Sequence, residues 1–271
     1  MSGEGLIAVL PMYDFPWTAA ANDALWASIS ARLAKAGVRS PARLTRGGDL
    51  AALWRDPGLV FGQTCGYPYV SGLNDAVTLI ATPQYSFPGC EGASHRSFIV
   101  RAARDPRRAL SEFPGATAAL NAPDSNTGMN LFRAAIAPIA RGAPFFRAIV
   151  VTGSHEASLA AVADGVADLA SIDCVSFALL KAGRPELLAR VAIVAESPLS
   201  PGLPFIAAAG LPQTTIAAVR EALFAALKDP DLAEARAALG LTGAGVATPA
   251  DYDRVIEIER DATAAGYARL A

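Results

Sequence analysis

Cysteine, histidine and charge are scarce in this sequence of 271 residues, and each shortage excludes a class of protein. The three cysteines are an odd number, which argues against a disulfide framework. Two histidines are too few for a histidine-rich metal site. Charged residues make up only 18% of the chain and the formal net charge is −2, so no general attraction to nucleic acid or anionic lipid is expected.

Long apolar runs are also lacking. No stretch approaches the ~18 uncharged apolar residues that a membrane-spanning helix requires, so no direct insertion into a membrane is expected. The apolar run at residues 6–10 is too short for the core of a signal peptide, and no basic segment precedes it. The sequence therefore predicts either a cytoplasmic protein or one from which an export signal has been removed.

Hydrophobic residues make up 52% of the chain, which is enough to bury the cores of two ordinary domains. Strand and helix patterns alternate, which predicts an α/β protein with mainly parallel sheets flanked by helices. A first long helix is expected at about residues 19–36, where it stops at Gly37. The expected strands cover residues 6–10, 59–62, 77–81, 97–100, 117–121, 148–152, 169–172 and 206–209.

Two segments rich in proline and glycine suit crossings between domains, near residues 90–95 and 196–204. A chain that leaves one domain, builds a second and returns would form domain I from residues 1–92 and 198–271. Domain II would then be residues 93–197. A cleft between two such domains is a favoured place for a ligand.

The segment AALNAPDSNTGMNLFRAA, at residues 118–135, carries the clearest indication of function. It predicts a strand, a polar turn and a helix whose first turn holds Ser125, Asn126, Thr127 and Gly128. A helix start has unpaired N–H groups and a partial positive charge, and small residues let an anion approach it closely. No lysine accompanies the turn, so it is not the phosphate loop of a nucleotide hydrolase. The simpler interpretation is that Ser125 or Asn126 only caps the helix.

Three more loops follow expected strands, at the carboxyl ends where open α/β sheets place ligands. They carry Tyr13, Tyr67 and His155, and Asp173 ends a further strand. Each side chain can hydrogen-bond a ligand, but each also has a simpler interpretation. The tyrosines can pack between domains, His155 can bond the backbone at a helix end, and Asp173 can cap the following turn.

Four segments carry a resemblance to a known family: LVFGQTCGYPYV, SHRSFIVRA, ALNAPDSNTGMN and, above all, GSHEASLAAVADGVADLASID. From residue 6 to about residue 252 the chain resembles the substrate-binding proteins of phosphonate and phosphate ABC transporters. The resemblance implies a type 2 periplasmic-binding-protein fold with a ligand cleft between two domains. The residues that it implies as ligand-binding are Tyr13, Tyr67, Ser125, Asn126, Thr127, Gly128, His155 and Asp173. The chain departs from the family pattern in its turn, which reads DSNTG, and in the cysteine at position 65.

The function expected from this resemblance is capture of a small oxyanion by domain closure, in an ABC-type uptake system. Such a protein delivers its ligand to a permease, performs no catalysis and needs neither a metal nor another cofactor.

Two other classes of function remain open at this stage. A cytoplasmic enzyme on the same fold, resembling the menaquinone-pathway lyases, would use His155 or Asp173 for acid–base catalysis. Cys65 with His155 would be a thiolate pair in such an enzyme, although a small cleft or core residue is the simpler interpretation of Cys65. A cytoplasmic ligand-sensing module would have to act through another protein, because the sequence has no DNA-binding motif.

Overall fold

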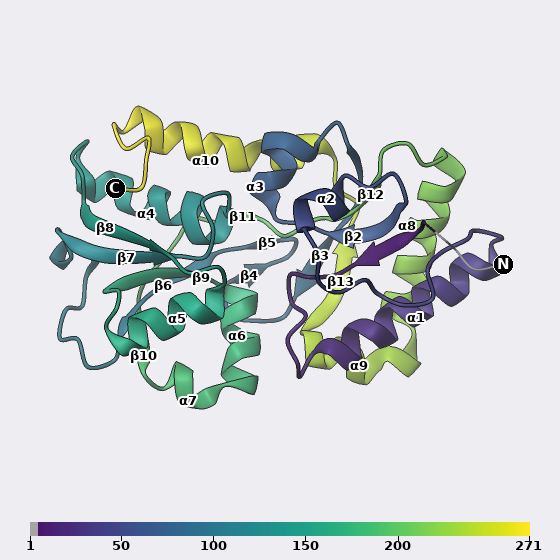
Figure 1. The fold of residues 1–271 in the computed structure, drawn as a ribbon, viewed down its shortest axis with the longest axis horizontal. Coiled ribbons are helices and arrows are strands. Elements are labelled where there is room, and N and C mark those ends of the chain that lie inside the picture. Colours follow the sequence, from purple (N-terminus) through teal and green to yellow (C-terminus); the bar gives the residue numbers. More distant parts are fainter. Residues whose placement is uncertain (1–4) are drawn as a thin grey trace. The chain divides into compact units, whose positions relative to one another are not determined.

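The computed structural model describes residues 5–271, which form two units (Figure 1). Unit 1 contains the described residues up to Ser86 together with Gly202–Asp251. Unit 2 contains Phe87–Pro201 together with Tyr252–Ala271. Each unit therefore combines segments that are far apart in the sequence.

Unit 1 is built on a five-stranded sheet with the strand order β1-β2-β12-β3-β13. Its strands are Ile7–Val9 (β1), Leu59–Gln63 (β2), Val77–Tyr85 (β3), Phe205–Ala208 (β12) and Leu241–Gly245 (β13). Its helical segments are Ala19–Lys35 (α1), Leu50–Trp54 (α2), Gly66–Pro68 (α3), Tyr69–Leu73 (η1), Gln213–Lys228 (α8), Pro230–Leu232 (η4) and Ala233–Leu239 (α9), and Pro249–Tyr252 (η5) leads into unit 2.

Helix α1 illustrates how the sequence builds the core of unit 1. Leu25, Trp26, Ile29 and Leu33 recur at three- and four-residue spacing, which is the period of one helix face, and all four are buried. The Trp26 ring stacks on Phe61 of β2, with ring centroids 5.9 Å apart. This packing holds α1 against the sheet and fixes β2, from which the loop with Tyr67 emerges.

Unit 2 is built on a second five-stranded sheet, with the order β10-β6-β9-β7-β8, and a small sheet with the order β11-β5-β4. Its strands are Cys90–Glu91 (β4), Ser94–His95 (β5), Ser97–Ala102 (β6), Ala116–Leu120 (β7), Phe146–Val151 (β8), Leu169–Asp173 (β9), Val191–Glu196 (β10) and Ser200–Pro201 (β11). Its helical segments are Leu110–Glu112 (η2), Asn126–Asn130 (η3), Leu131–Ala140 (α4), His155–Asp164 (α5), Cys174–Gly183 (α6), Pro185–Leu188 (α7) and Asp253–Ala264 (α10). In Figure 1, α4 and α10 lie on one side of the larger sheet and α5, α6 and α7 on the other.

Both large sheets are mixed, so the prediction of mainly parallel sheets is wrong in this respect. The pairs β1–β2, β7–β8 and β7–β9 are parallel, but β12 runs against β2 and β3, β13 runs against β3, and β6 runs against β9 and β10. The reason lies in the crossings. β12 is the first strand after the chain returns to unit 1, and its first residue, Phe205, pairs with the last residue of β2, Gln63. β6 is the first strand of the large sheet of unit 2, and it starts beside the end of β9. A chain that enters at the edge where other strands end has to run in the opposite direction to them.

The C-terminal segment also differs from the predicted division, which placed residues 198–271 together in domain I. Residues Tyr252–Ala271 belong instead to unit 2. The Arg133 guanidinium of α4 donates to the Ala268 carbonyl at 2.9 Å, and the Phe145 amide donates to the Ala271 carbonyl at 2.6 Å. Residues 1–4 of the predicted domain I lie outside the described residues.

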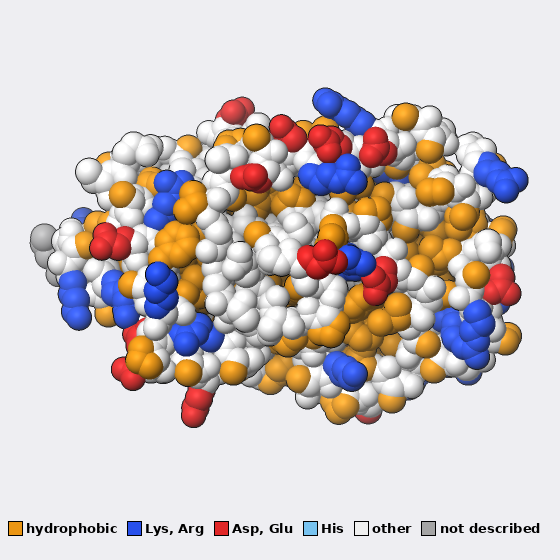
Figure 2. Space-filling model, turned by 180° about the vertical axis from the view of Figure 1, so that it is seen from behind, with side chains coloured by type: hydrophobic (Ala, Val, Ile, Leu, Met, Phe, Trp, Pro, Cys, Tyr) orange, Lys and Arg blue, Asp and Glu red, His pale blue; other side chains and the backbone are white. Residues whose placement is uncertain are grey.

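Acidic and basic side chains are interspersed over the face shown in Figure 2. This distribution agrees with the formal net charge of −2. Because the charges are mixed in this way, attraction of a small anion would depend on local donors rather than on the overall charge of the protein.

Within residues 5–271, no helix is long and apolar enough to cross a membrane.

Candidate functional site

Strands β7, β8 and β9 of unit 2 are parallel neighbours, so the segments that follow them leave the sheet at the same edge. The segment after β7 leads to the turn at residues 125–128, the segment after β8 leads to His155, and β9 ends at Asp173. Sequence order alone predicted this common edge. The described structure thus brings six of the eight predicted site residues to one end of one sheet.

Ser125 caps the helical run that starts at η3 and continues into α4. Its hydroxyl accepts a hydrogen bond from the Gly128 amide at 3.0 Å, and its carbonyl accepts from the Met129 and Asn130 amides. Asn126 and Thr127 are the first two residues of this run, where no intrahelical carbonyl is available for their amides. The helix start is therefore a donor-rich position, while the Ser125 side chain serves as its cap.

Asn126 and Gly128 hold the turn in place. The fully buried Asn126 amide group donates to the Ser200 hydroxyl at 2.8 Å, and its oxygen accepts from Asn130 at 3.0 Å. A Cβ on Gly128 would lie 1.7 Å from Asn121 Oδ1, so only glycine lets Asn121 approach the turn this closely. Both residues thus have a structural role, which the sequence interpretation did not include when it assigned them to ligand binding.

Thr127 is hydrogen-bonded to two strands and a helix. Its carbonyl accepts hydrogen bonds from the hydroxyls of Ser97 on β6, at 2.9 Å, and Ser171 on β9, at 2.6 Å. Its own hydroxyl lies 3.0 Å from Nε2 of His155. Ser97 and Ser171 were missed by the sequence analysis, which treated both positions only as parts of strands. These bonds fix Thr127 where the starts of two helices meet.

His155 is the first residue of α5, and the N-cap of this helix is Ser154, whose hydroxyl accepts from the Ala157 amide at 3.0 Å. The residue as a whole is half-buried, but its Nδ1 atom is enclosed. Burial lowers the pKa of His155 below its ordinary value of 6.5, and the nearby Asp173 carboxylate offsets only part of this effect. A neutral ring at Thr127 can donate from Nε2 or accept there, according to its tautomer.

Asp173 forms a buried ion pair with His95 of β5, with 3.0 Å between the carboxylate and Nδ1. Its other oxygen accepts from the Ser176 amide at 2.7 Å, so the predicted capping role is present. Burial alone would raise the pKa of Asp173, but His95 and the Ser176 amide bring it below the ordinary 3.8. Burial alone would likewise lower the pKa of His95, but the carboxylate raises it above 6.5.

His95 itself was missed by the sequence analysis as a site residue. Its Nε2 atom is buried and has no hydrogen-bond partner among the described residues. Buried polar atoms are nearly always hydrogen-bonded, so this nitrogen marks a position where a water molecule or a ligand is expected. The only available signal in the sequence was a histidine within the SHRSF segment.

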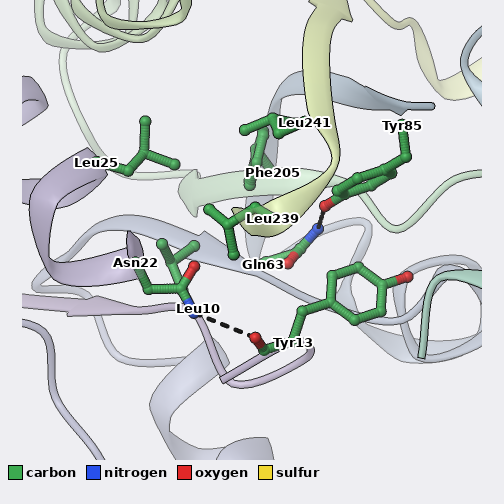
Figure 3. A pocket seen from close by; sticks show the side chains of 9 residues that line it. All are labelled: Leu10, Tyr13, Asn22, Leu25, Gln63, Tyr85, Phe205, Leu239 and Leu241. Carbon is green, nitrogen blue, oxygen red and sulfur yellow. Dashed lines mark hydrogen bonds between the residues drawn. The ribbon is translucent and has the colours of Figure 1, made fainter. Parts of the chain in front are cut away.

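Tyr13 and Tyr67 belong to unit 1. The buried Tyr13 ring lies edge-to-face against Tyr85, with centroids 5.4 Å apart, and both rings line a small pocket with Asn22 and Gln63 (Figure 3). The Gln63 side chain donates to the Tyr85 hydroxyl at 3.3 Å. The space enclosed is on the order of a single water molecule. Tyr67 is half-buried, and its carbonyl accepts from Ser71 at 2.8 Å.

Metal ligands do not cluster in the part of the chain that the structure describes, where no group of three or more His, Cys, Asp or Glu side chains is placed to hold an ion. What the described residues of unit 2 provide is a neutral histidine, a hydroxyl and the first amides of a helix, beside an internally compensated ion pair. Such a set can hold an anion by hydrogen bonds without a compensating cation.

The family described as ABC transporter, phosphonate, periplasmic substrate-binding protein matches residues 7–252. This match bears out the resemblance noted from the sequence. It also favours a substrate-binding function over the enzyme alternative. A comparison with curated protein sequences found no significant match.

Several solved structures are similar to the described fold. PA3383 from Pseudomonas aeruginosa, a binding protein component of an ABC phosphonate transporter, has a TM-score of 0.75 at 13% identity, covering 96% of this chain and 87% of that chain. PhnD1 from Prochlorococcus marinus, in complex with methylphosphonate, has a TM-score of 0.74 at 14% identity, covering 96% and 98%. MatC from Rhodopseudomonas palustris, with bound malate, has a TM-score of 0.59 at 13% identity, covering 96% and 97%. These likenesses confirm the predicted two-domain binding-protein fold.

Proposed function

Because the chain belongs to the family of periplasmic substrate-binding proteins of ABC phosphonate transporters, we propose that Thr127 and His155 bind the oxyanion group of its ligand. The ligand class is a phosphonate or a phosphate-like anion, as in PhnD1 with methylphosphonate. The protein hands this ligand to a permease and performs no covalent chemistry on it.

The observation that carries the proposal is the 3.0 Å contact between the Thr127 hydroxyl and His155 Nε2. It brings the start of the η3–α4 run next to the start of α5. Both helix starts present a partial positive charge, and they do so at the same edge of one sheet. An anion at this point is therefore favoured by two helix dipoles together with two side chains.

Burial strengthens this site. Thr127 is 3% exposed, so water competes little for its donors. In such surroundings a hydrogen bond to a charged ligand contributes roughly 1.5–3 kcal/mol. Three or four donors then approach the ~8 kcal/mol of micromolar binding after the costs of association. Hydrogen bonds alone therefore suffice for capture.

Tyr13 and Tyr67 complete the proposal from unit 1. Each follows a strand of the parallel pair β1–β2, so the two loops leave the unit 1 sheet at one edge. We propose that both tyrosines are further ligand-binding residues, as the family resemblance predicts, and that domain closure on the ligand captures it.

The test is isothermal titration calorimetry of the full chain with methylphosphonate, inorganic phosphate, sulfate and malate. We expect Thr127→Val and His155→Ala to weaken binding of the preferred anion by roughly 10- to 150-fold, because each removes one hydrogen bond to a charged group. Thr127→Val keeps the β-branched shape and the backbone amide, so a loss of affinity reports the hydroxyl.

Thr117→Val is the matched control. It removes a buried threonine hydroxyl from the amino-terminal part of β7, at the end of the strand remote from the turn. Its affinity should equal that of the wild type. Unchanged affinity in both site variants would contradict the assignment of Thr127 and His155, and wild-type protein that binds none of the four anions would contradict the proposed function itself.

A further inference from the structure

Two of the three cysteines lie together in unit 2, although 84 positions separate them in the chain. Cys90 is the first residue of β4 and Cys174 is the first residue of α6. Both are thiols in this structure, and their Sγ atoms are 3.5 Å apart. Disulfide bonds have a sulfur–sulfur length of about 2.05 Å, so an approach of about 1.5 Å would join them.

The backbone is built to keep these two residues adjacent. Gly89 has a φ of +90°, and a Cβ there would lie 2.8 Å from the Cys174 Cβ and 3.1 Å from its sulfur. Only glycine therefore lets the chain before Cys90 pass so close to Cys174. The Arg96 amide donates to the Gly89 carbonyl, and the Arg96 carbonyl accepts from the Cys174 amide, both at 3.1 Å. Arg96 thus connects the two cysteine segments through main-chain bonds.

The two thiols differ in accessibility. Cys90 is half-buried, whereas Cys174 is fully buried. The hydrogen bond with Cys90 and burial, together with the adjacent Asp173 carboxylate, raise the pKa of the Cys174 thiol. Because the thiolate is the nucleophile, Cys90 is the thiol that an external reagent can reach and engage first.

We propose that Cys90 and Cys174 are a reversible dithiol–disulfide site, oxidised by thiol–disulfide exchange with an external disulfide. The Cys90 thiolate, having lost its proton to solvent, attacks one sulfur of the oxidant, forms a mixed disulfide and releases one thiolate. The Cys174 sulfur, giving up its proton, then attacks Cys90 and releases the second thiolate. Two electrons pass from the cysteines to the oxidant, whose disulfide becomes two thiols.

Each cysteine is adjacent to one member of the Asp173–His95 ion pair. Cys174 directly follows Asp173, and Cys90 is paired with His95 across the β4–β5 hairpin. A bond between the cysteines would therefore link the segments that carry the buried ion pair, and would close a loop of more than eighty residues within unit 2.

The experiment uses a Cys65→Ser background, which leaves Cys90 and Cys174 as the remaining thiols. The full chain is reduced, incubated anaerobically with glutathione disulfide, denatured and labelled with N-ethylmaleimide for intact-mass analysis. We expect two labelled thiols before oxidation, none afterwards, and no retained glutathione. Peptide mapping should find the Cys90–Cys174 bridge, and the melting temperature of the oxidised form should rise by roughly 5–15 °C and fall again with dithiothreitol.

Two further variants in the same background test the order of attack. With Cys174→Ser, Cys90 should accumulate one glutathione that no second thiol displaces. With Cys90→Ser, the buried Cys174 should stay unmodified in the folded protein, as circular dichroism verifies. Two thiols still labelled after oxidation would overturn the site, and equal glutathione loading of both variants would overturn the assigned roles of the two sulfurs.

Discussion

Nδ1 of His95 lies 3.0 Å from a carboxylate oxygen of Asp173, and the two side chains are only 3% and 2% exposed. A buried charge is tolerated only when it is paired, so each of these residues depends on the other. The pair stands between the small β4–β5 hairpin and the end of β9, beside the Thr127–His155 contact. Its electrostatics therefore support both the fold of unit 2 and the candidate site.

Removal of His95 should destabilise unit 2 strongly. His95→Ala leaves the Asp173 carboxylate buried without its cation, for which a loss of about 3–5 kcal/mol in unfolding free energy is expected. Urea denaturation followed by circular dichroism measures it. Tryptophan fluorescence serves as an internal control, because Trp17, Trp26 and Trp54 all belong to unit 1.

The double variant His95→Ala/Asp173→Asn separates the ion pair from simple loss of volume. Neutralising the carboxylate removes the unpaired charge, so the double variant should be more stable than His95→Ala alone. A double variant as unstable as the sum of both single changes would contradict the interaction.

The pair should also give unit 2 a characteristic pH dependence. The pKa of His95 is raised above 6.5, so its contribution is complete below that pH and is lost as the pH rises through the folded-state value. The pKa of Asp173 is lowered below 3.8, so its contribution is complete above that pH and is lost in stronger acid. The difference in unfolding free energy between wild type and His95→Gln should be largest between these two values, 3.8 and 6.5.

His155 acts in the opposite direction. Its pKa is lowered, so it destabilises the folded state as the pH falls below 6.5. Comparing wild type with His95→Gln removes most of this effect, because both proteins keep the burial of His155, which is the largest cause of its lowered pKa. A difference that grows from pH 6.5 toward pH 9 would contradict the assigned charges.

The turn, its strands and its helix starts could be predicted because their signals are local. Ser154 and Gly165 act as the caps of α5, and residues of these types at the two ends of a helical pattern are signals that a sequence contains. Parallel strands that follow one another put the turn, His155 and Asp173 at one edge. The positions of helices and strands follow from periodicity and breaker residues, which a single sequence contains.

The partners of these residues could not be predicted, because they come from distant segments. His95 reaches Asp173 through β6, which pairs antiparallel with β9, and that reversal was not expected from the alternating pattern. The strand β13 was not expected, because the glycines at positions 243 and 245 are poor strand formers. The close approach of Asn121 to Gly128 could not be predicted either, since the two residues meet only in three dimensions.

Gly128→Ala should lower stability and binding together. Its backbone does not require glycine, since its φ is not positive, but the new Cβ would lie 1.7 Å from Asn121 Oδ1. We expect a loss of roughly 1–3 kcal/mol in unfolding free energy and weaker anion binding. Gly210→Ala is the control, because a Cβ there meets nothing within 4 Å. Adding Asn121→Ala should restore stability to Gly128→Ala, and a failure to do so would contradict the steric explanation.

Ser97 and Ser171 should act as a coupled pair, because both hydroxyls donate to the Thr127 carbonyl, at 2.9 and 2.6 Å. Either alanine variant leaves that buried carbonyl one donor, so each should cost about 1 kcal/mol. The double variant leaves it none and should cost more than the sum, by roughly 0.5 kcal/mol or more. It should also bind the anion several-fold more weakly, since Thr127 loses its anchors to β6 and β9. Ser158→Ala provides the comparison, because its buried hydroxyl bonds Thr152 at 2.6 Å, and it should show no coupling with Ser97→Ala. If the losses of unfolding free energy of the two single variants add up strictly to that of the double variant in urea denaturation, the two serines do not position Thr127 jointly.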